Sequence, residues 1–185
     1  MKTEIRSSLL KKLKNLSADA KSRASAIIQN ELKVLLKNQK GYWAGYQNLS
    51  DEPAFSWSEV ASQIDWCFPV VEKETLKFRT SAKTFQISPL GIKEPSDGEE
   101  VDLEEINGCV IPGVSFDKKG VRLGRGKGYY DRALAQYNGK KIGVCYETSF
   151  CEELPQEVHD VQCERIVTEK SVYLTGPSEG DSKWS

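Results

Sequence analysis

Residues 111–131 read IPGVSFDKKGVRLGRGKGYYD, and this stretch decides the predicted fold class. It continues an apolar run, Cys109–Pro112, that is typical of a buried strand, and it leads into a helix predicted over Lys127–Tyr137. Helices that alternate with short apolar runs are typical of α/β proteins. The stretch therefore predicts a strand, a glycine-rich turn and a helix of an α/β protein.

The alternation continues on both sides of this stretch. Lys141–Tyr146 and Arg165–Thr168 predict two further strands. Upstream, the continuous apolar run Trp66–Val71 is typical of a strand that is covered on both faces. The sequence therefore predicts an α/β fold, namely a three-layer α/β/α sandwich with a mostly parallel, Rossmann-like sheet.

The N-terminal half of the chain supplies two predicted helices. Apolar residues at helical spacing predict the first, and Ser17 is placed to cap the second. Their predicted buried residues are Ile5, Leu9, Leu13 and Leu16 in the first helix, and Ile27, Ile28, Leu32 and Leu35 in the second. The remaining expectations are a strand over Tyr42–Tyr46, a turn-rich loop to Pro53, a helix over Ser58–Ile64, a strand over Thr75–Thr80 beside Trp66–Val71, and a loop over Ser88–Glu105 with a helical turn around Asp102–Ile106.

Length and composition limit the class of protein. The 185 residues predict one domain over 1–176 and a flexible tail over 177–185. With 26 basic and 27 acidic residues, no overall field attracts nucleic acid. No apolar run suits a membrane span and no secretory signal is visible, so we expect a cytoplasmic protein. The five scattered cysteines predict reduced thiols, several of them buried.

The turn before the predicted helix has the chemistry of a phosphate site. Gly124, Gly126 and Gly128 allow the backbone to approach an anion closely, and the amides at a helix start point toward it. Arg122, Arg125 and Lys127 add positive charge suited to a polyphosphate and a transferring phosphoryl group.

Other interpretations of the same residues stay open. Asp131 suits a Mg²⁺ ligand or an ion pair within the helix, with Lys127 or Arg132. Tyr129 and Tyr130 suit a ring-bearing ligand, although we expect one of them to pack in the core. The turn is not a Walker A motif, because Gly128 stands where Ser or Thr is required. A solvated basic turn and an RNA contact are further alternatives.

The run from Pro112 to Asp131 resembles a family signature, P-G-[VL]-x-F-D-x-x-G-x-R-L-G-[RH]-G-x-G-Y-Y-D, of the 5-formyltetrahydrofolate cyclo-ligases. About twenty positions match. The resemblance extends more faintly over nearly the whole chain, through Lys2, Arg6, Glu52, Ile92–Pro95, His159-Asp160 and Ile166–Glu169.

The resemblance implies an enzyme that converts 5-formyltetrahydrofolate and ATP to 5,10-methenyltetrahydrofolate, ADP and phosphate in one cleft. The formyl oxygen attacks the γ-phosphate, N10 closes the ring, and phosphate leaves. The implied partners are the reduced folate and ATP with Mg²⁺, and we expect a monomer that binds neither nucleic acid nor membrane.

The resemblance also implies site residues. Arg125 and Lys127 would be catalytic, Asp131 and Asp160 would bind Mg²⁺, and His159 is not expected to act in catalysis. The implied ATP contacts are Lys2, Arg6, Arg122, Leu123, Gly124, Arg125, Gly126, Lys127, Gly128, Tyr129 and Tyr130. The implied folate contacts are Glu52 at the pterin, Arg125, Gly126, Lys127, Gly128 and Tyr129.

Three competing functions remain at this stage. A divergent enzyme could keep the ATP loop and act on another formyl or amide substrate. An RNA- or phosphate-binding module would bind nucleic acid in a salt-sensitive way and hydrolyse no ATP. A structural or regulatory protein with a degenerate site is the third alternative. The intact signature favours the cyclo-ligase.

Overall fold

The computed structural model describes residues 1–80, 84–88, 91–158 and 160–175. Their main sheet has eight strands in the order β12-β11-β10-β7-β1-β2-β3-β6. The four central pairings, from β11 through β10, β7 and β1 to β2, are parallel, and the pairings at both edges are antiparallel. The predicted mostly parallel sheet is therefore confirmed.

The strands of this sheet are short except for two that cross its middle. Their bounds are β1 Gly41–Ala44, β2 Ile64–Glu72, β3 Thr75–Thr80, β6 Glu100–Val101, β7 Ile106–Pro112, β10 Lys140–Val144, β11 Arg165–Val167 and β12 Val172–Leu174. Two small hairpins stand apart from it, β4 Phe85–Ile87 with β5 Lys93–Pro95, and β8 Ser115–Phe116 with β9 Arg122–Leu123.

The helices begin close to where the sequence predicts them. The Ser17 side chain accepts a hydrogen bond from the Ala20 amide at 3.1 Å, which confirms it as the cap of the second helix. The α-helices are α1 Lys2–Asn15, α2 Ala18–Leu36, α3 Trp57–Val60 and α4 Tyr129–Ala133. Single 3-10 turns lie at Leu103–Glu105, as expected, and at Glu147–Ser149.

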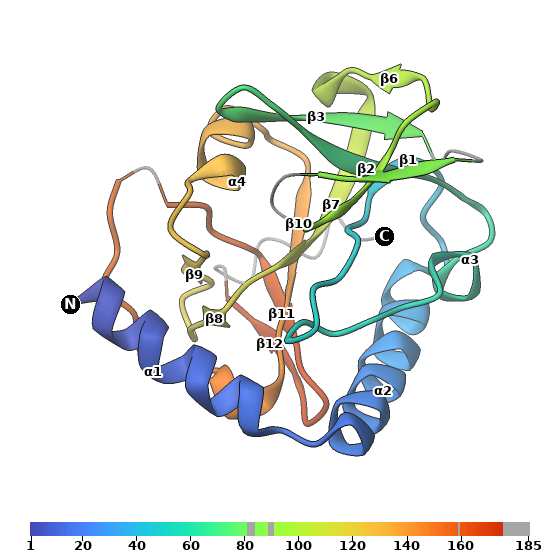
Figure 1. The fold of residues 1–185 in the computed structure, drawn as a ribbon. Coiled ribbons are helices and arrows are strands. Elements are labelled where there is room, and N and C mark those ends of the chain that lie inside the picture. Colours follow the sequence, from blue (N-terminus) through green and yellow to red (C-terminus); the bar gives the residue numbers. More distant parts are fainter. Residues whose placement is uncertain (81–83, 89–90, 159, 176–185) are drawn as a thin grey trace.

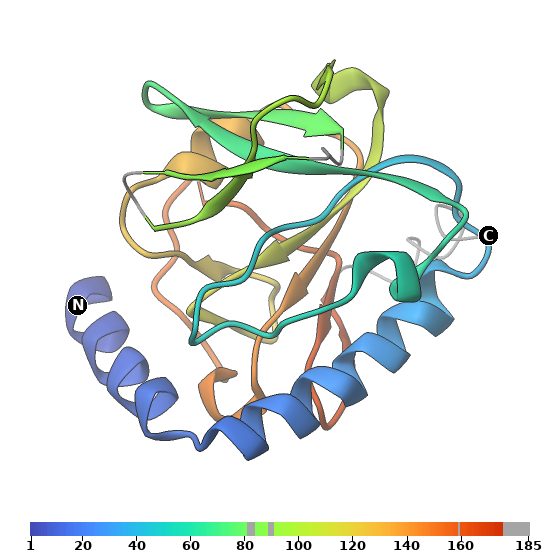
Figure 2. The same ribbon diagram turned by 45° about the vertical axis from the view of Figure 1, so that its right-hand side comes forward.

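Successive side chains of the central strands pack alternately into two cores, one on each face of the sheet. Trp43 packs in the first core with the apolar sides of α1 and α2, whereas its neighbour Ala44 belongs to the second. Val110 and Ile111 divide in the same way. Figures 1 and 2 show α1 and α2 together along one side of the sheet, and α4 on the other.

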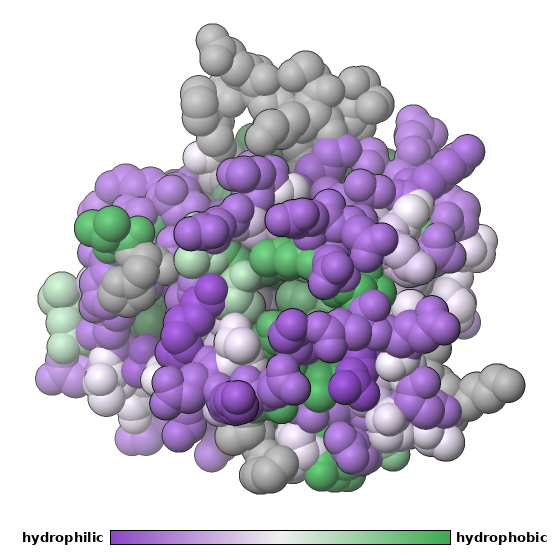
Figure 3. Space-filling model, turned by 90° about the horizontal axis from the view of Figure 1, so that it is seen from above, coloured by the Kyte–Doolittle hydropathy of each residue, from purple (hydrophilic) through white to green (hydrophobic). Residues whose placement is uncertain are grey.

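The layer on the second face is thinner than the sequence predicts. The helix expected over Lys127–Tyr137 is wrong in extent, because α4 covers only Tyr129–Ala133. Gly128 has φ of +68°, outside the right-handed helical region, so the helix begins after it. From above the view of Figure 1, Figure 3 shows hydrophobic atoms in a central hollow that hydrophilic side chains surround.

Several smaller expectations also need correction. Ile27 is 46% exposed, whereas Ile28 beside it is fully buried and turns toward the sheet. The helix predicted over Ser58–Ile64 ends at Val60, because β2 already begins at Ile64. The segment predicted as a loop contains β5 and β6, and the antiparallel edge strand β12 is unpredicted. The tail predicted over 177–185 lies outside the described residues.

All five cysteines are free thiols, as expected. Cys67, Cys109, Cys145 and Cys163 are buried, and burial raises the pKa of Cys109 and of Cys145 to about 12. These thiols therefore stay protonated and behave as core residues. Among the described residues, none of the helices combines the length and apolar character that crossing a bilayer requires.

Helix α2 provides a test of the first core. Leu32 is fully buried, whereas Val34 on the same helix is 62% exposed. We expect Leu32→Ala to lower the free energy of unfolding by about 2–5 kcal/mol because it leaves a cavity, and Val34→Ala to change it by about 0.5 kcal/mol or less. Urea unfolding of both variants measures this. Equal losses would contradict the packing described here.

Candidate active site

A cavity of about 310 Å³ lies where the loops after β1 and β7 meet. The two strands are parallel neighbours, so their carboxyl ends fall at the same edge of the sheet. Strands β2 and β5, the start of β3 and the start of α4 complete the wall. Its lining residues are Tyr46, Gln47, Leu49, Glu52, Pro69, Val71, Leu76, Ile92, Glu94, Pro112, Gly113, Val114, Arg122, Gly124, Arg125, Lys127, Gly128, Tyr129 and Tyr130.

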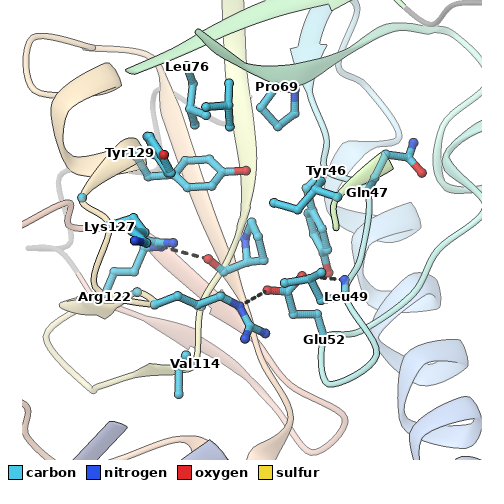
Figure 4. A pocket seen from close by; sticks show the side chains of 18 of the residues that line it. Tyr46, Gln47, Leu49, Glu52, Pro69, Leu76, Val114, Arg122, Lys127 and Tyr129 are labelled. Atoms are coloured by element: carbon cyan, nitrogen blue, oxygen red, sulfur yellow. Dashed lines mark hydrogen bonds and ion pairs between the residues drawn. The ribbon is translucent and has the colours of Figure 1, made fainter. Parts of the chain in front are cut away.

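The walls differ in chemistry. Figure 4 shows Lys127 and Tyr129 on one side and Tyr46 with Glu52 on the other, and the apolar Leu76 and Pro69 lie above them. An apolar cavity with a few convergent polar groups is the usual form of a small-molecule site. This arrangement suits a ligand with a flat ring and a charged end.

Arg125 joins the two loops across the cavity. Its Nε donates to Glu52 Oε1 at 3.1 Å, and its Nη2 contacts Asp51 Oδ1. Glu52 Oε2 accepts from the Leu49 amide at 2.9 Å. Both acids are at least nine-tenths buried, and burial raises the pKa of Glu52 although Arg125 opposes the shift.

Two glycines of the predicted phosphate turn have positive φ. Gly126 and Gly128 have φ of +92° and +68°, conformations that residues with a Cβ rarely adopt. The Lys127 ammonium makes no hydrogen bond or ion pair within the described part of the chain, so its charge is available to a ligand. The turn thus exposes a cation between two glycines.

The first helix reaches the same turn from another side. Arg6 Nε donates to the Gly124 carbonyl at 2.7 Å, and the Arg6 guanidinium lies against Gly126, where an added Cβ would come within 3.4 Å of it. Arg6 is therefore brought to the predicted phosphate site from a position more than a hundred residues away in the sequence.

The other predicted contacts divide between cavity and core. Arg122 is 8% exposed, donates from Nε to the Pro112 carbonyl at 2.8 Å, and holds its guanidinium 4.7 Å from the centre of the Tyr130 ring. Tyr129 and Tyr130 both line the cavity and also pack against the second core. The Leu123 side chain is buried in the first core and does not line the cavity.

The two predicted metal ligands are both neighbours of Val161. Asp131 Oδ1 accepts from the Val161 amide at 3.3 Å and lies 3.9 Å from Arg122 Nη1, so its charged neighbour is outside its own helix. Asp160 lies next to Val161 in sequence, and its Oδ2 is 2.7 Å from Lys2 Nζ. The ion pair of Asp131 with Lys127 or Arg132 that the sequence left open is not found among the described residues.

Lys2 therefore meets a carboxylate rather than open solvent. Burial lowers the pKa of Lys2, but its hydrogen bonds to Asp160 and Glu157 outweigh this effect and raise it. No group of three or more His, Cys, Asp or Glu side chains among the described residues could hold a metal by itself. Two acids still suit Mg²⁺, which takes most of its ligands from phosphates and water. His159 lies outside the described residues.

Sequence reasoning missed several residues of the site. Asp51 shares Arg125 with Glu52, and its place directly before a predicted site acid was the only signal. Glu94 belongs to Ile92–Pro95, a segment that the sequence connects only with the family resemblance. The apolar walls, Leu76 and Pro69 among them, come from strands whose patterns look like ordinary core. Only their position beside the two loops makes them part of the cavity.

Comparisons with known proteins decide the family. A model described as the 5-formyltetrahydrofolate cyclo-ligase family matches residues 1–169. The chain belongs to this family. The enzyme class expected from residues 112–131, a ligase of folate metabolism, is thereby confirmed.

Solved cyclo-ligase relatives share the fold over almost their full length. The 5,10-methenyltetrahydrofolate synthetase of Aquifex aeolicus is 34% identical, with a TM-score of 0.85 over 96% of this chain and 95% of that one. The synthetase of Mycoplasma pneumoniae is 28% identical, with a TM-score of 0.76 over 91% and 98%. The mouse 5-formyltetrahydrofolate cyclo-ligase is 26% identical over 92% of this chain and 94% of that protein.

Some relatives match only part of the chain. The Schizosaccharomyces pombe protein, described as a probable 5-formyltetrahydrofolate cyclo-ligase, is 30% identical over 49% of this chain, and the match spans 52% of that protein. The two solved synthetases, which cover 96% and 91% of this chain, support the same α/β fold.

The buried Glu52 predicts a pH dependence of stability. Because its pKa is raised, the folded protein keeps this proton above the ordinary value of about 4.3, where the unfolded chain has lost it. Its contribution to the free energy of unfolding is therefore present below about pH 4 and is lost as the pH rises through the raised pKa.

Glu52→Gln removes this titration. Relative to wild type, we expect the variant to gain stability as the pH rises from 4 to 7, measured by urea unfolding at each pH. Glu99→Gln, at an exposed position, is the matched control. A difference between Glu52→Gln and wild type that is flat or falls with pH would contradict the raised pKa.

Proposed function

We propose that this cyclo-ligase converts 5-formyltetrahydrofolate to 5,10-methenyltetrahydrofolate with cleavage of ATP to ADP and phosphate. One observation carries the proposal. The glycine turn with the unpaired Lys127 and the carboxylate of Glu52 face the same cavity, so groups suited to phosphate and groups suited to a pterin act in one place.

The chemistry needs phosphorylation before ring closure. A formyl oxygen is a poor leaving group, and attack of this oxygen on the γ-phosphorus, with loss of ADP, makes it a phosphate ester. N10 then attacks the formyl carbon and loses its proton to solvent, the C–O bond breaks, and phosphate departs with the electron pair. Catalysis of this kind depends on positioning and on stabilising charge on the phosphoryl oxygens.

The residues of the turn suit that role. Lys127 and Arg125 would contact the transferring phosphoryl group, while Arg6 would meet the nucleotide phosphates from the side of α1. Arg122 would support the turn, because its hydrogen bond to Pro112 ties the start of the loop to its middle. The Gly126 and Gly128 amides would add donors close to the anion.

Glu52 would bind the pterin from the opposite wall. A carboxylate can accept from a ring N–H and an exocyclic amine at once. Its partner Arg125 fixes the direction of the carboxylate, and Asp51 holds Arg125. Tyr46, Leu76 and Tyr129 supply apolar surface for the ring.

Asp131 and Asp160 would hold Mg²⁺ together with phosphate oxygens. The ion neutralises charge on the phosphates when bound. The Lys2 ammonium, now bonded to Asp160, would stay nearby as a phosphate contact. We further propose that the enzyme acts as a cytoplasmic monomer.

The proposal is tested by following the absorbance of the methenyl product with purified protein, 5-formyltetrahydrofolate and MgATP. We expect product with wild type and none when EDTA removes the metal. Lys127→Ala should lower kcat at least a hundredfold, because it removes the charge nearest the phosphoryl group. Lys118→Ala is the matched control, since Lys118 is exposed and pairs with Glu152 at 2.6 Å.

Two outcomes would contradict the assignment. If wild type binds ATP and never forms product, the substrate is another formyl or amide compound. If Lys127→Ala and Lys118→Ala retain the same rate, the glycine turn is not the phosphate site.

A further inference from the structure

Glu94 is a buried carboxylate in the wall of the cavity. It lies in β5, which pairs with β4 and packs against β2. Its exposed fraction is only 3%, and it lines the same cavity as Glu52. Oε1 accepts from the Val71 amide at 3.2 Å. Its other oxygen, Oε2, makes no hydrogen bond or ion pair with any described residue.

The other buried acids of the described chain are better compensated. Asp51 and Glu52 share Arg125. Asp117 accepts three backbone amides, from Lys119, Val121 and Leu154, at 2.9 Å each. Among the described residues, Glu94 has one amide partner and no cation. A buried carboxylate with so few partners is costly unless a ligand supplies the missing donor.

Glu94 and Glu52 lie on different walls of the cavity. It is bonded to Val71, two residues after Pro69 in β2, and Figure 4 shows Pro69 across the cavity from Glu52. The surroundings on this side are apolar, with Ile92, Leu76 and Val71. A ring held between these walls would meet the Glu52 carboxylate from the loop after β1 and the Glu94 carboxylate from β5.

The chemistry of the proposed substrate indicates which donor Glu94 meets. If Glu52 takes the pyrimidine N–H and one hydrogen of the amino group, the donors that remain on the bicyclic ring are the second amino hydrogen and N8–H, because N5 carries the formyl group. Of these two donors, only N8–H depends on the oxidation state of the ring. The oxidised ring of folic acid has no hydrogen on N8. A carboxylate at this point would therefore distinguish reduced from oxidised pterins.

We propose that Glu94 is a specificity-determining residue whose Oε2 accepts a hydrogen bond from N8–H of the reduced pterin ring. This inference rests on the proposed function, because it takes the folate as the occupant of the cavity. A hydrogen bond to a charged acceptor contributes enough binding free energy to account for a tenfold higher affinity for the reduced ring than for the oxidised one.

Glu94→Gln tests the proposal. The glutamine has one acceptor oxygen, so either the Val71 amide or N8–H faces a second donor. We expect calorimetric titration to show that the variant binds 5-formyltetrahydrofolate at least tenfold more weakly than wild type, and folic acid less than twofold more weakly. Glu104→Gln, at an exposed position, should change neither affinity.

The decisive quantity is the affinity for 5-formyltetrahydrofolate divided by the affinity for folic acid. Partial unfolding of the variant lowers both affinities equally and leaves the ratio unchanged. A ratio equal to that of wild type would overturn the proposal, whether both affinities fall or neither does.

The same measurements distinguish a failure of the proposed function from a failure of the role proposed for Glu94. If wild type binds 5-formyltetrahydrofolate but forms no product with MgATP, the reaction is wrong and the ratio still decides the role of Glu94. If wild type binds neither folate, both proposals are wrong.

Discussion

The ion pairs of Arg125 with Asp51 and Glu52 are the constraint on which the site depends. They join the loop after β1 to the loop after β7, and these loops meet because the two strands are parallel neighbours. Both carboxylates are buried, so removing the cation would leave two uncompensated charges in a wall of the cavity. The same contact thus holds the cavity together and directs Glu52 into it.

Charge is divided across the cavity in a way that suits two unlike substrates. Cations gather at the glycine turn, where Lys127 has no partner in the described part of the chain and Arg6 arrives from α1. Carboxylates stand at the other walls, Glu52 beside Arg125 and Glu94 beside Val71. The first region would suit a polyphosphate, and the second a ring rich in N–H donors. Arg125 compensates two of the acids, Asp51 and Glu52.

The sequence predicts much of this arrangement but not its geometry. The strand ending at Pro112, the glycine turn and the capped second helix are local patterns, so residue types and spacing suffice to find them. The length of α4 was missed at both ends: Gly128, at positive φ, prevents an earlier start, and Leu134, with φ of −102° and ψ of 10°, has left the helical conformation well before Tyr137. Asp51 and Glu94 were missed because a buried acid looks like a surface acid until its neighbours in space are known. Whether Asp160 binds Lys2 or a metal likewise depends on a contact between opposite ends of the chain.

We propose that the glycine turn around Lys127 and the wall that carries Glu52 serve one coupled reaction. The amounts of ADP and 5,10-methenyltetrahydrofolate formed in the same reaction test it most directly. With MgATP and 5-formyltetrahydrofolate in excess, the account predicts one ADP for each molecule of product and no ADP when the folate is left out. Product without ADP, or ADP formed at the same rate without folate, would contradict it.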